Sequence, residues 1–147
     1  MALTGDRVVA LQTLNDAQSA TGTTTSTTYT ATLAAGGTAC GKVFVAPASG
    51  SVVIHNATQI QASAGNSFCT IRVRTGDTIG SGTDVLPAGD DDAVITNVAA
   101  VVIRAGVDVP VDGLTPGNTY NAQQLFKNDA AGTCTVSRKK IIVKPQP

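Results

Sequence analysis

The sequence predicts an all-β protein: a single β-sandwich or jelly-roll-like domain of about eight strands, preceded by an extended N-terminal arm. Thr and Val dominate, with 21 Thr and 17 Val against 7 Leu and no Glu among 147 residues. Such β-branched residues favour strands over helices. Segments of alternating polar and apolar residues recur along the chain, separated by turns rich in Gly, Pro and Asn. Aromatic residues make up only 3%, so small aliphatic side chains must build the core.

The first 28 residues are predicted to be an arm and a linker, and residues 29–147 to form the sandwich. The Thr-, Ser- and Gly-rich segment 17–28 has few side chains to bury, as in a flexible linker or an exposed strand edge. The short apolar segment before it is suited to reach a neighbouring subunit and add a strand to its sheet. The candidate partner contacts of this arm are Val8, Val9, Leu11 and Leu14.

The strands of the sandwich are predicted in order along the chain. They lie within segments 28–33, 41–47, 48–66, 67–76, 83–86, 93–106, 118–128 and 133–145. Segment 67–76 alternates most clearly, because Cys69, Ile71 and Val73 point one way and Thr70, Arg72 and Arg74 the other. Arg72 and Arg74 are therefore candidates for an exposed basic face that contacts a partner. Segment 93–106 is apolar on both faces, which indicates a central strand or one that meets a partner.

The last two segments are predicted to pair as a hairpin through residues 129–132. The apolar phase of the final strand switches between Val136 and Ile141, and a bulge near residues 138–140 would accommodate this slip. Tyr120 follows the turn "LTPGN", which predicts a tyrosine corner with a buried ring and a hydroxyl that bonds nearby backbone. Core positions are expected for Tyr29, Tyr120, Phe126, Ile71 and Val73.

Charge and composition argue against two classes of partner. The net charge is zero with ten basic and ten acidic residues, and the only basic run is the short "RKK" at 138–140, so no nucleic-acid partner is expected. No apolar run reaches the roughly 18 residues of a membrane helix, and the first residues do not resemble a secretory signal. We therefore expect synthesis in a cytoplasm, with Cys40, Cys69 and Cys134 as small buried thiols. A bridge between Cys69 and Cys134 remains open.

No segment carries a recognisable catalytic or cofactor motif. His55 is the single histidine, and no G-x-S-x-G elbow accompanies it. The acidic run "GDDDA" at 89–93 suggests calcium, but consecutive Asp side chains point apart, and a solvated loop is favoured. Sugar platforms use stacked aromatic rings, and the two tyrosines are expected in the core. We predict no enzyme, no catalytic residue, no metal and no cofactor, and keep a carbohydrate- or calcium-binding module as an alternative.

Two segments resemble small structural proteins of tailed bacteriophages, particularly those that infect actinobacteria. They are "SGSVVIHNATQIQASAGNSFCTIRVRTGDTIGSGTDVLPAGDDDAV" (49–94) and "VDGLTPGNTYNAQQLFKNDAAGTCTVSRKKIIVKPQP" (111–147). The resemblance implies a virion protein with a sandwich fold and no enzymatic activity. A capsid decoration (cement) protein fits best, with the major capsid protein as partner, a homotrimer as assembly and the capsid exterior as location. A minor tail or fibre-base protein of the virion is the alternative.

Overall fold

The computed structural model describes residues 12–147 and confirms the all-β sandwich. Val8, Val9 and Leu11, three of the four predicted arm contacts, lie outside the described residues. No helix in residues 12–147 is long and apolar enough to cross a membrane. Ten strands are present: β1 (Leu14–Gln18), β2 (Gly22–Thr24), β3 (Gly41–Val45), β4 (Val52–Ala62), β5 (Ser67–Thr75), β6 (Asp84–Leu86), β7 (Val94–Thr96), β8 (Ile103–Val111), β9 (Thr119–Asn128) and β10 (Cys134–Pro145).

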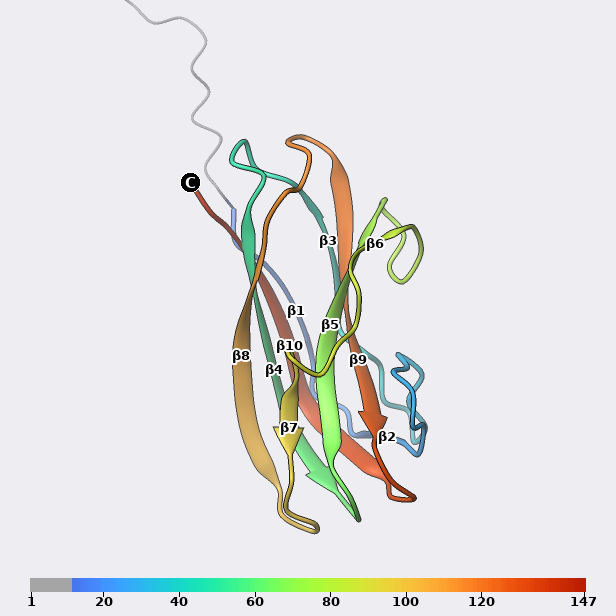
Figure 1. The fold of residues 1–147 in the computed structure, drawn as a ribbon. Coiled ribbons are helices and arrows are strands. Elements are labelled where there is room, and N and C mark those ends of the chain that lie inside the picture. Colours follow the sequence, from blue (N-terminus) through green and yellow to red (C-terminus); the bar gives the residue numbers. More distant parts are fainter. Residues whose placement is uncertain (1–11) are drawn as a thin grey trace, which may run out of the picture.

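The strands form two antiparallel sheets that pack face to face along the long axis of the molecule (Figure 1). Sheet A has the order β1-β10-β4-β8, with the short β2 also paired to β10; sheet B has the order β3-β9-β5-β6, with β7 also paired to β5. Successive strands alternate between the two sheets from β3 to β5, and again from β7 to β10. This alternation between sheets is the arrangement of a jelly roll.

Small aliphatic side chains fill the space between the sheets, as the low aromatic content requires. Along β4 every second residue is buried, and the inner faces of both sheets contribute mainly Val, Ile and Cys. The predicted core residues Ile71, Val73 and Phe126 are each 0% exposed. Three buried thiols belong to this core, and all three are free, so Cys69 and Cys134 are not bridged.

The predicted tyrosine corner is present in the turn before β9. Tyr120 is 5% exposed, and its ring stacks on that of Phe44 at a centroid separation of 5.9 Å. The backbone N–H of Thr115 donates a hydrogen bond of 2.9 Å to the Tyr120 hydroxyl. The hydroxyl therefore satisfies a turn amide while the ring fills the core.

Several sequence-based expectations differ from the structure. Segment 28–33 is not a strand, and only Thr30 pairs with another residue, Phe126. Tyr29 is half-buried rather than a core residue. Segment 93–106 is broken into β7 and the start of β8, which lie in different sheets. An apolar run of this length can cross between sheets, because the side chains at both of its ends pack into the core: Val94 from β7, and Ile103 from β8.

The predicted hairpin between the last two strands is wrong. β9 pairs with β3 and β5 in sheet B, whereas β10 pairs with β1, β2 and β4 in sheet A. Residues 129–133 cross between the sheets beside the β4–β5 connection, where Asn66 and Asp129 are hydrogen-bonded. Turn chemistry specifies a reversal of the chain, but the sheet that the next strand joins depends on these contacts between distant segments.

Sheet A also begins earlier than the predicted boundary between arm and sandwich. Leu14 pairs with Val143 of β10 and packs against the main core cluster. β1 and β2 both lie within residues 1–28, the span expected to be arm and linker. In this part of the chain the structure therefore places strands of the sandwich itself.

Candidate interaction surfaces

A β-bulge in β10 shapes the outer face of sheet A, at the position that the phase switch predicted. The pairing of β10 with β4 shifts between Ser137 and Lys140, and Arg138 adopts a positive φ of 47°. Lys139 points inward, is 1% exposed and donates from its ammonium to the carbonyl of Ala20. Burial lowers the pKa of Lys139 below its ordinary value. The bulge thus turns one lysine into the interior and leaves its two neighbours on the surface.

A buried amide from sheet B supports the bulge from beneath. Gln124 of β9 is 0% exposed. Its Nε2 group donates to Oδ1 of Asn56 at 2.7 Å, and to the carbonyls of Ala57 and Lys140 at 3.1 and 3.2 Å. Asn56 in turn donates to the carbonyl of Cys69 at 2.9 Å. These bonds join the two sheets and satisfy backbone carbonyls next to the bulge.

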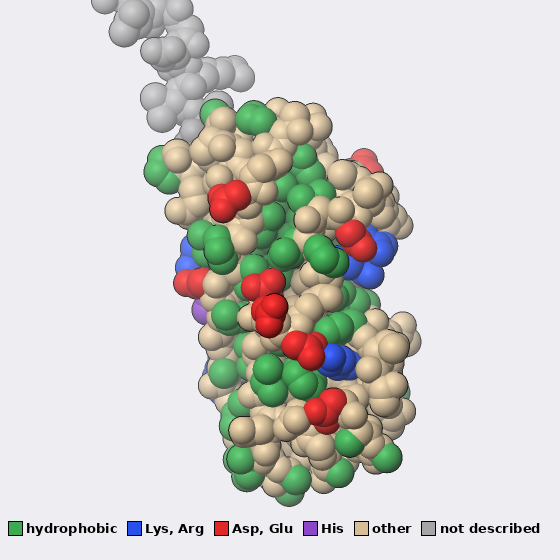
Figure 2. Space-filling model, viewed as in Figure 1, with side chains coloured by type: hydrophobic (Ala, Val, Ile, Leu, Met, Phe, Trp, Pro, Cys, Tyr) green, Lys and Arg blue, Asp and Glu red, His purple; other side chains and the backbone are tan. Residues whose placement is uncertain are grey.

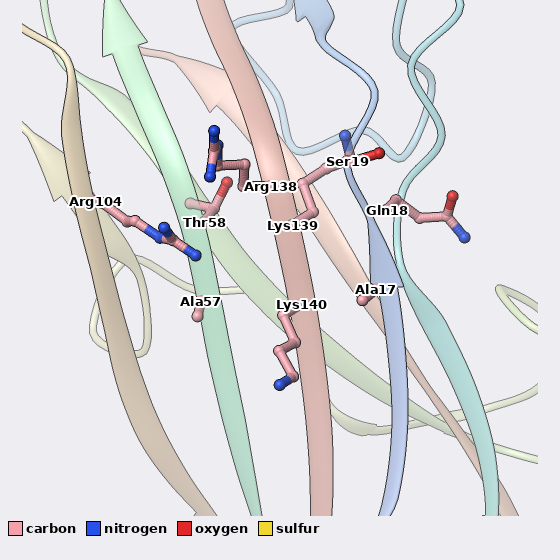
Figure 3. Close-up of a pocket in the computed structure, with 9 residues that line it drawn as sticks. All are labelled: Ala17, Gln18, Ser19, Ala57, Thr58, Arg104, Arg138, Lys139 and Lys140. Carbon is pink, nitrogen blue, oxygen red and sulfur yellow. The ribbon is translucent and has the colours of Figure 1, made fainter.

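Above this network lies a shallow depression of about 290 Å³ in the outer face of sheet A (Figure 3). We call it the basic depression. One row of paired residues crosses the sheet and consists of Ala17, Lys140, Ala57 and Gly106. Lys140 is therefore the one long side chain in this row. In Figure 3, Arg104 extends from β8 toward β4, and Arg138 and Lys140 extend from β10. No carboxylate of residues 12–147 forms an ion pair with these three cations.

The next row of the same face contains His55 and the carboxylate of Asp108. Nδ1 of His55 lies 2.6 Å from Oδ1 of Asp108, and Nζ of Lys144 lies 4.0 Å from the same oxygen. The hydrogen bond from His55 is the main cause that lowers the pKa of Asp108. The imidazole also lies over Gly106, where a Cβ atom would come within 2.9 Å of its Cε1. This row therefore bounds the basic depression on one side.

Arg72 and Arg74, the predicted basic face, lie on β5, between β9 and β6 of sheet B, and are partly buried. Nε of Arg74 donates to Oδ1 of Asp84 at 2.6 Å, and Nε of Arg72 lies 3.9 Å from the same oxygen. Burial and the neighbouring Arg74 lower the pKa of Arg72. Asp84 thus compensates part of the charge of both side chains. Their contact with a partner stays a prediction.

The acidic loop at 89–93 contacts sheet B rather than forming a ligand cluster. Asp90 accepts a hydrogen bond of 2.7 Å from the Tyr29 hydroxyl and lies 2.6 Å from Nζ of Lys127. The bond from Lys127 and then that from Tyr29 lower the pKa of Asp90, while burial and Asp90 raise the pKa of Tyr29. Among residues 12–147, no group of three or more His, Cys or Asp side chains is placed to hold a metal ion.

The buried thiols are held in their protonated form. Burial is the main cause that raises the pKa of Cys40 to about 12 and that of Cys134 to about 11. Burial raises the pKa of Cys69 as well. A thiol is nucleophilic only as the thiolate, so these side chains act as small core residues.

The connection between β7 and β8 exposes apolar side chains at one end of the sandwich. Ile95, Val98, Val101 and Val102 are 43%, 53%, 45% and 52% exposed. We call residues 95–102 the apolar turn. It is tied to the end of β4, because the N–H of Ala100 donates to the carbonyl of Ala62 at 2.8 Å. Hydrophobic side chains are visible at the end of the molecule where Figure 1 shows this connection (Figure 2).

Comparisons with known proteins do not assign a family. No family model matches the chain, and no curated protein matches it. A solved structure described as that of the infectious bursal disease virus Gx strain is similar, with a TM-score of 0.41 and 13% sequence identity over 90% of this chain. The present chain covers 36% of that chain. A likeness at this level identifies neither a family nor a function.

Proposed function

We propose that the protein is a non-catalytic structural component of a virion, and specifically a decoration protein on the outer shell of a tailed-phage capsid. The observation that carries this proposal is the apolar turn, whose valines are about half exposed although the turn is anchored to β4. A contiguous exposed apolar patch is typical of an interaction site. Jelly-roll sandwiches occur in viral capsid domains, and also in lectins, and the sequence resemblance favours the former.

The chemistry of the side chains supports a non-catalytic role. His55 pairs with Asp108 on the sheet surface, without a serine or cysteine partner among the described residues. The thiols are buried and protonated, as described above. The interior is filled by aliphatic side chains, which suits a protein that binds through its surface.

The proposal is tested by adding the purified protein to capsids that lack it. We expect the wild-type chain to bind and to raise the temperature at which the shell opens. Replacing Val98 and Val102 by Ser should abolish binding without unfolding the domain, because it removes half-exposed apolar surface from the contact. Val45→Ser is the matched control, because Val45 is 58% exposed but lies on β3. Equal binding by the double variant and the control would contradict the role of the apolar turn.

Mild dissociation of particles separates the decoration protein from a minor tail protein. A decoration protein should be released from the particle, and the shell should become less stable when it is released. A tail component should remain on isolated tails. The arm is tested by deleting residues 1–11, since Leu14 already belongs to β1. We expect that truncation to fold but to bind shells less tightly. The trimer on local threefold positions is tested by the mass of the released protein in native mass spectrometry.

A further inference from the structure

Two groups of cationic side chains can be compared among residues 12–147. At sheet B, Arg74 and Lys127 each lie 2.6 Å from an Asp carboxylate. At the basic depression, Arg104, Arg138 and Lys140 have no such partner among residues 12–147. From the side of β5 and β7, acidic side chains are spread down the surface with few basic ones (Figure 2). Three of the cations that have no ion-pair partner among residues 12–147 thus lie together in one hollow.

The three cations come from two strands that are not neighbours in the sheet. Arg104 and Lys140 lie on β8 and β10, which are separated by β4. Two inter-strand steps correspond to about 10 Å. In an extended peptide, carboxylates two residues apart lie about 7 Å apart on one face, so two or three of them match the spread. The small side chains of Ala17 and Ala57 leave room for a peptide backbone beside the cations, whereas the imidazole of His55 covers Gly106.

We infer that the basic depression binds an acidic segment of a partner protein, in an extended conformation across β4. This inference rests on the proposed function in one respect only, which is that the capsid shell supplies the acidic segment. This basic depression lies on the sheet opposite to Arg72 and Arg74, whose contact with a partner stays a separate prediction. Electrostatic complementarity of this kind fixes orientation and speeds association.

The surroundings of the depression favour a polypeptide over a nucleic acid. Nucleic-acid binders need many uncompensated cations, and here the adjacent row already contains the carboxylate of Asp108. Single-stranded binders also use aromatic side chains as stacking platforms. The residues that line the basic depression include none.

Nuclear magnetic resonance titration of the full chain tests this inference. The probes are a short peptide of alternating Glu and Ser, a short oligothymidylate and inorganic phosphate. We expect the Glu–Ser peptide to shift the backbone amides of Ala17, Ala57 and Gly106, and to bind more tightly than the other two probes. The shifts should disappear in about 0.5 M NaCl, where the Debye length is only a few ångströms.

Two charge reversals on one strand provide a matched pair of variants. Lys140→Glu lies in the depression, whereas Lys144→Glu lies on the same face of β10, beside Asp108. We expect K140E to weaken peptide binding about fivefold or more, because loss of an exposed charge contact brings up to about fivefold and the reversed charge adds repulsion. K144E should change it less than about twofold. Arg104→Glu should act like K140E. Amide spectra of each variant confirm that the fold is retained.

Several results would overturn the inference. They are shifts away from the depression, equal weakening by K140E and K144E, tighter binding of oligothymidylate or phosphate, and dimerisation of the chain through this face without peptide. Binding of K140E and wild type to capsids is measured separately. If the wild type does not bind capsids, the proposed function fails, and the peptide titration still decides this inference. If capsids bind both chains equally, the inference fails and the proposed function stands.

Discussion

Replacing Gln124 by Leu is expected to destabilise the protein and to loosen the bulge. Gln124 spans the interface between the sheets and donates to one side-chain oxygen and two backbone carbonyls. Leu has a similar volume, so the substitution removes the donor without opening a large cavity. The carbonyls of Ala57 and Lys140 lie beside the register shift of β10, and they would lose this donor.

The size of the effect follows from the hydrogen bonds. An amide has two N–H groups, so at most two full bonds to the three acceptors exist at once. A buried acceptor left without a donor costs about 1–3 kcal/mol, and two of them cost about 2–6 kcal/mol. In the wild type, Oε1 of Gln124 is itself buried without a partner among residues 12–147. Removing that oxygen and burying an apolar group instead raises the unfolding free energy of the variant by about 1–3 kcal/mol. The net loss should be about 2 kcal/mol.

Urea unfolding followed by circular dichroism measures this loss. Gln123→Leu is the matched control, because Gln123 lies next in sequence and is only partly buried; its unfolding free energy should stay within about 0.5 kcal/mol of the wild type. Gln124→Glu retains the shape and places a buried carboxylate opposite carbonyls, so it should lose more, about 3–5 kcal/mol. Faster amide exchange at Lys139 and Lys140 should accompany Q124L. A Q124L protein as stable as the wild type would refute the reasoning.

Three further predictions concern the corner, the thiols and one turn. Tyr120→Phe should lose about 1–2 kcal/mol in urea unfolding, because the Thr115 amide loses its acceptor. The folded state keeps the Cys40 and Cys134 thiols protonated above their ordinary pKa of 9.0. The unfolding free energy should therefore fall above pH 9, by about 1.4 kcal/mol per pH unit for each thiol. The variants C40A and C134A should each show a shallower fall. Gly82→Ala should lose more than about 2 kcal/mol in thermal unfolding, because φ is +100° and its Cβ would lie 1.9 Å from a backbone carbonyl; an unchanged melting temperature would contradict this.

The sequence was sufficient for the fold class because strands that cover a core alternate with period two. β4 shows this pattern over its full length. In β5 the burial alternates only from Ile71 to Arg74, because Ser67–Ile71 are all buried, and Thr70, which was expected to face outward, is 0% exposed. The bulge was predictable for a related reason, since one inserted residue moves all later side chains to the other face. The tyrosine corner depends only on a local turn and the ring after it. Each of these features is encoded within one short segment.

The features that were not predicted depend on contacts between distant segments. The course of residues 129–133 into sheet A is set partly by contacts with residues 63–66, such as the bonds between Asn66 and Asp129. Likewise, the compensation of Arg74 depends on Asp84 across a turn. A sequence pattern shows that an arginine points outward from a strand, but not whether an aspartate from another strand reaches it.

The same distinction explains why the basic depression could be foreseen only in part. The phase switch of β10 predicted the bulge near residues 138–140, but not which of the three cations there face solvent. Arg104 joins them because β4 pairs with both β8 and β10. The surface beside the cations is low because Ala17 and Ala57 both pair with Lys140. Each small residue alone is unremarkable in a strand. Together with the bulge supported by Gln124, they form a hollow whose charge has no counterpart in the described chain, and this is why a partner's carboxylates are the expected counterpart.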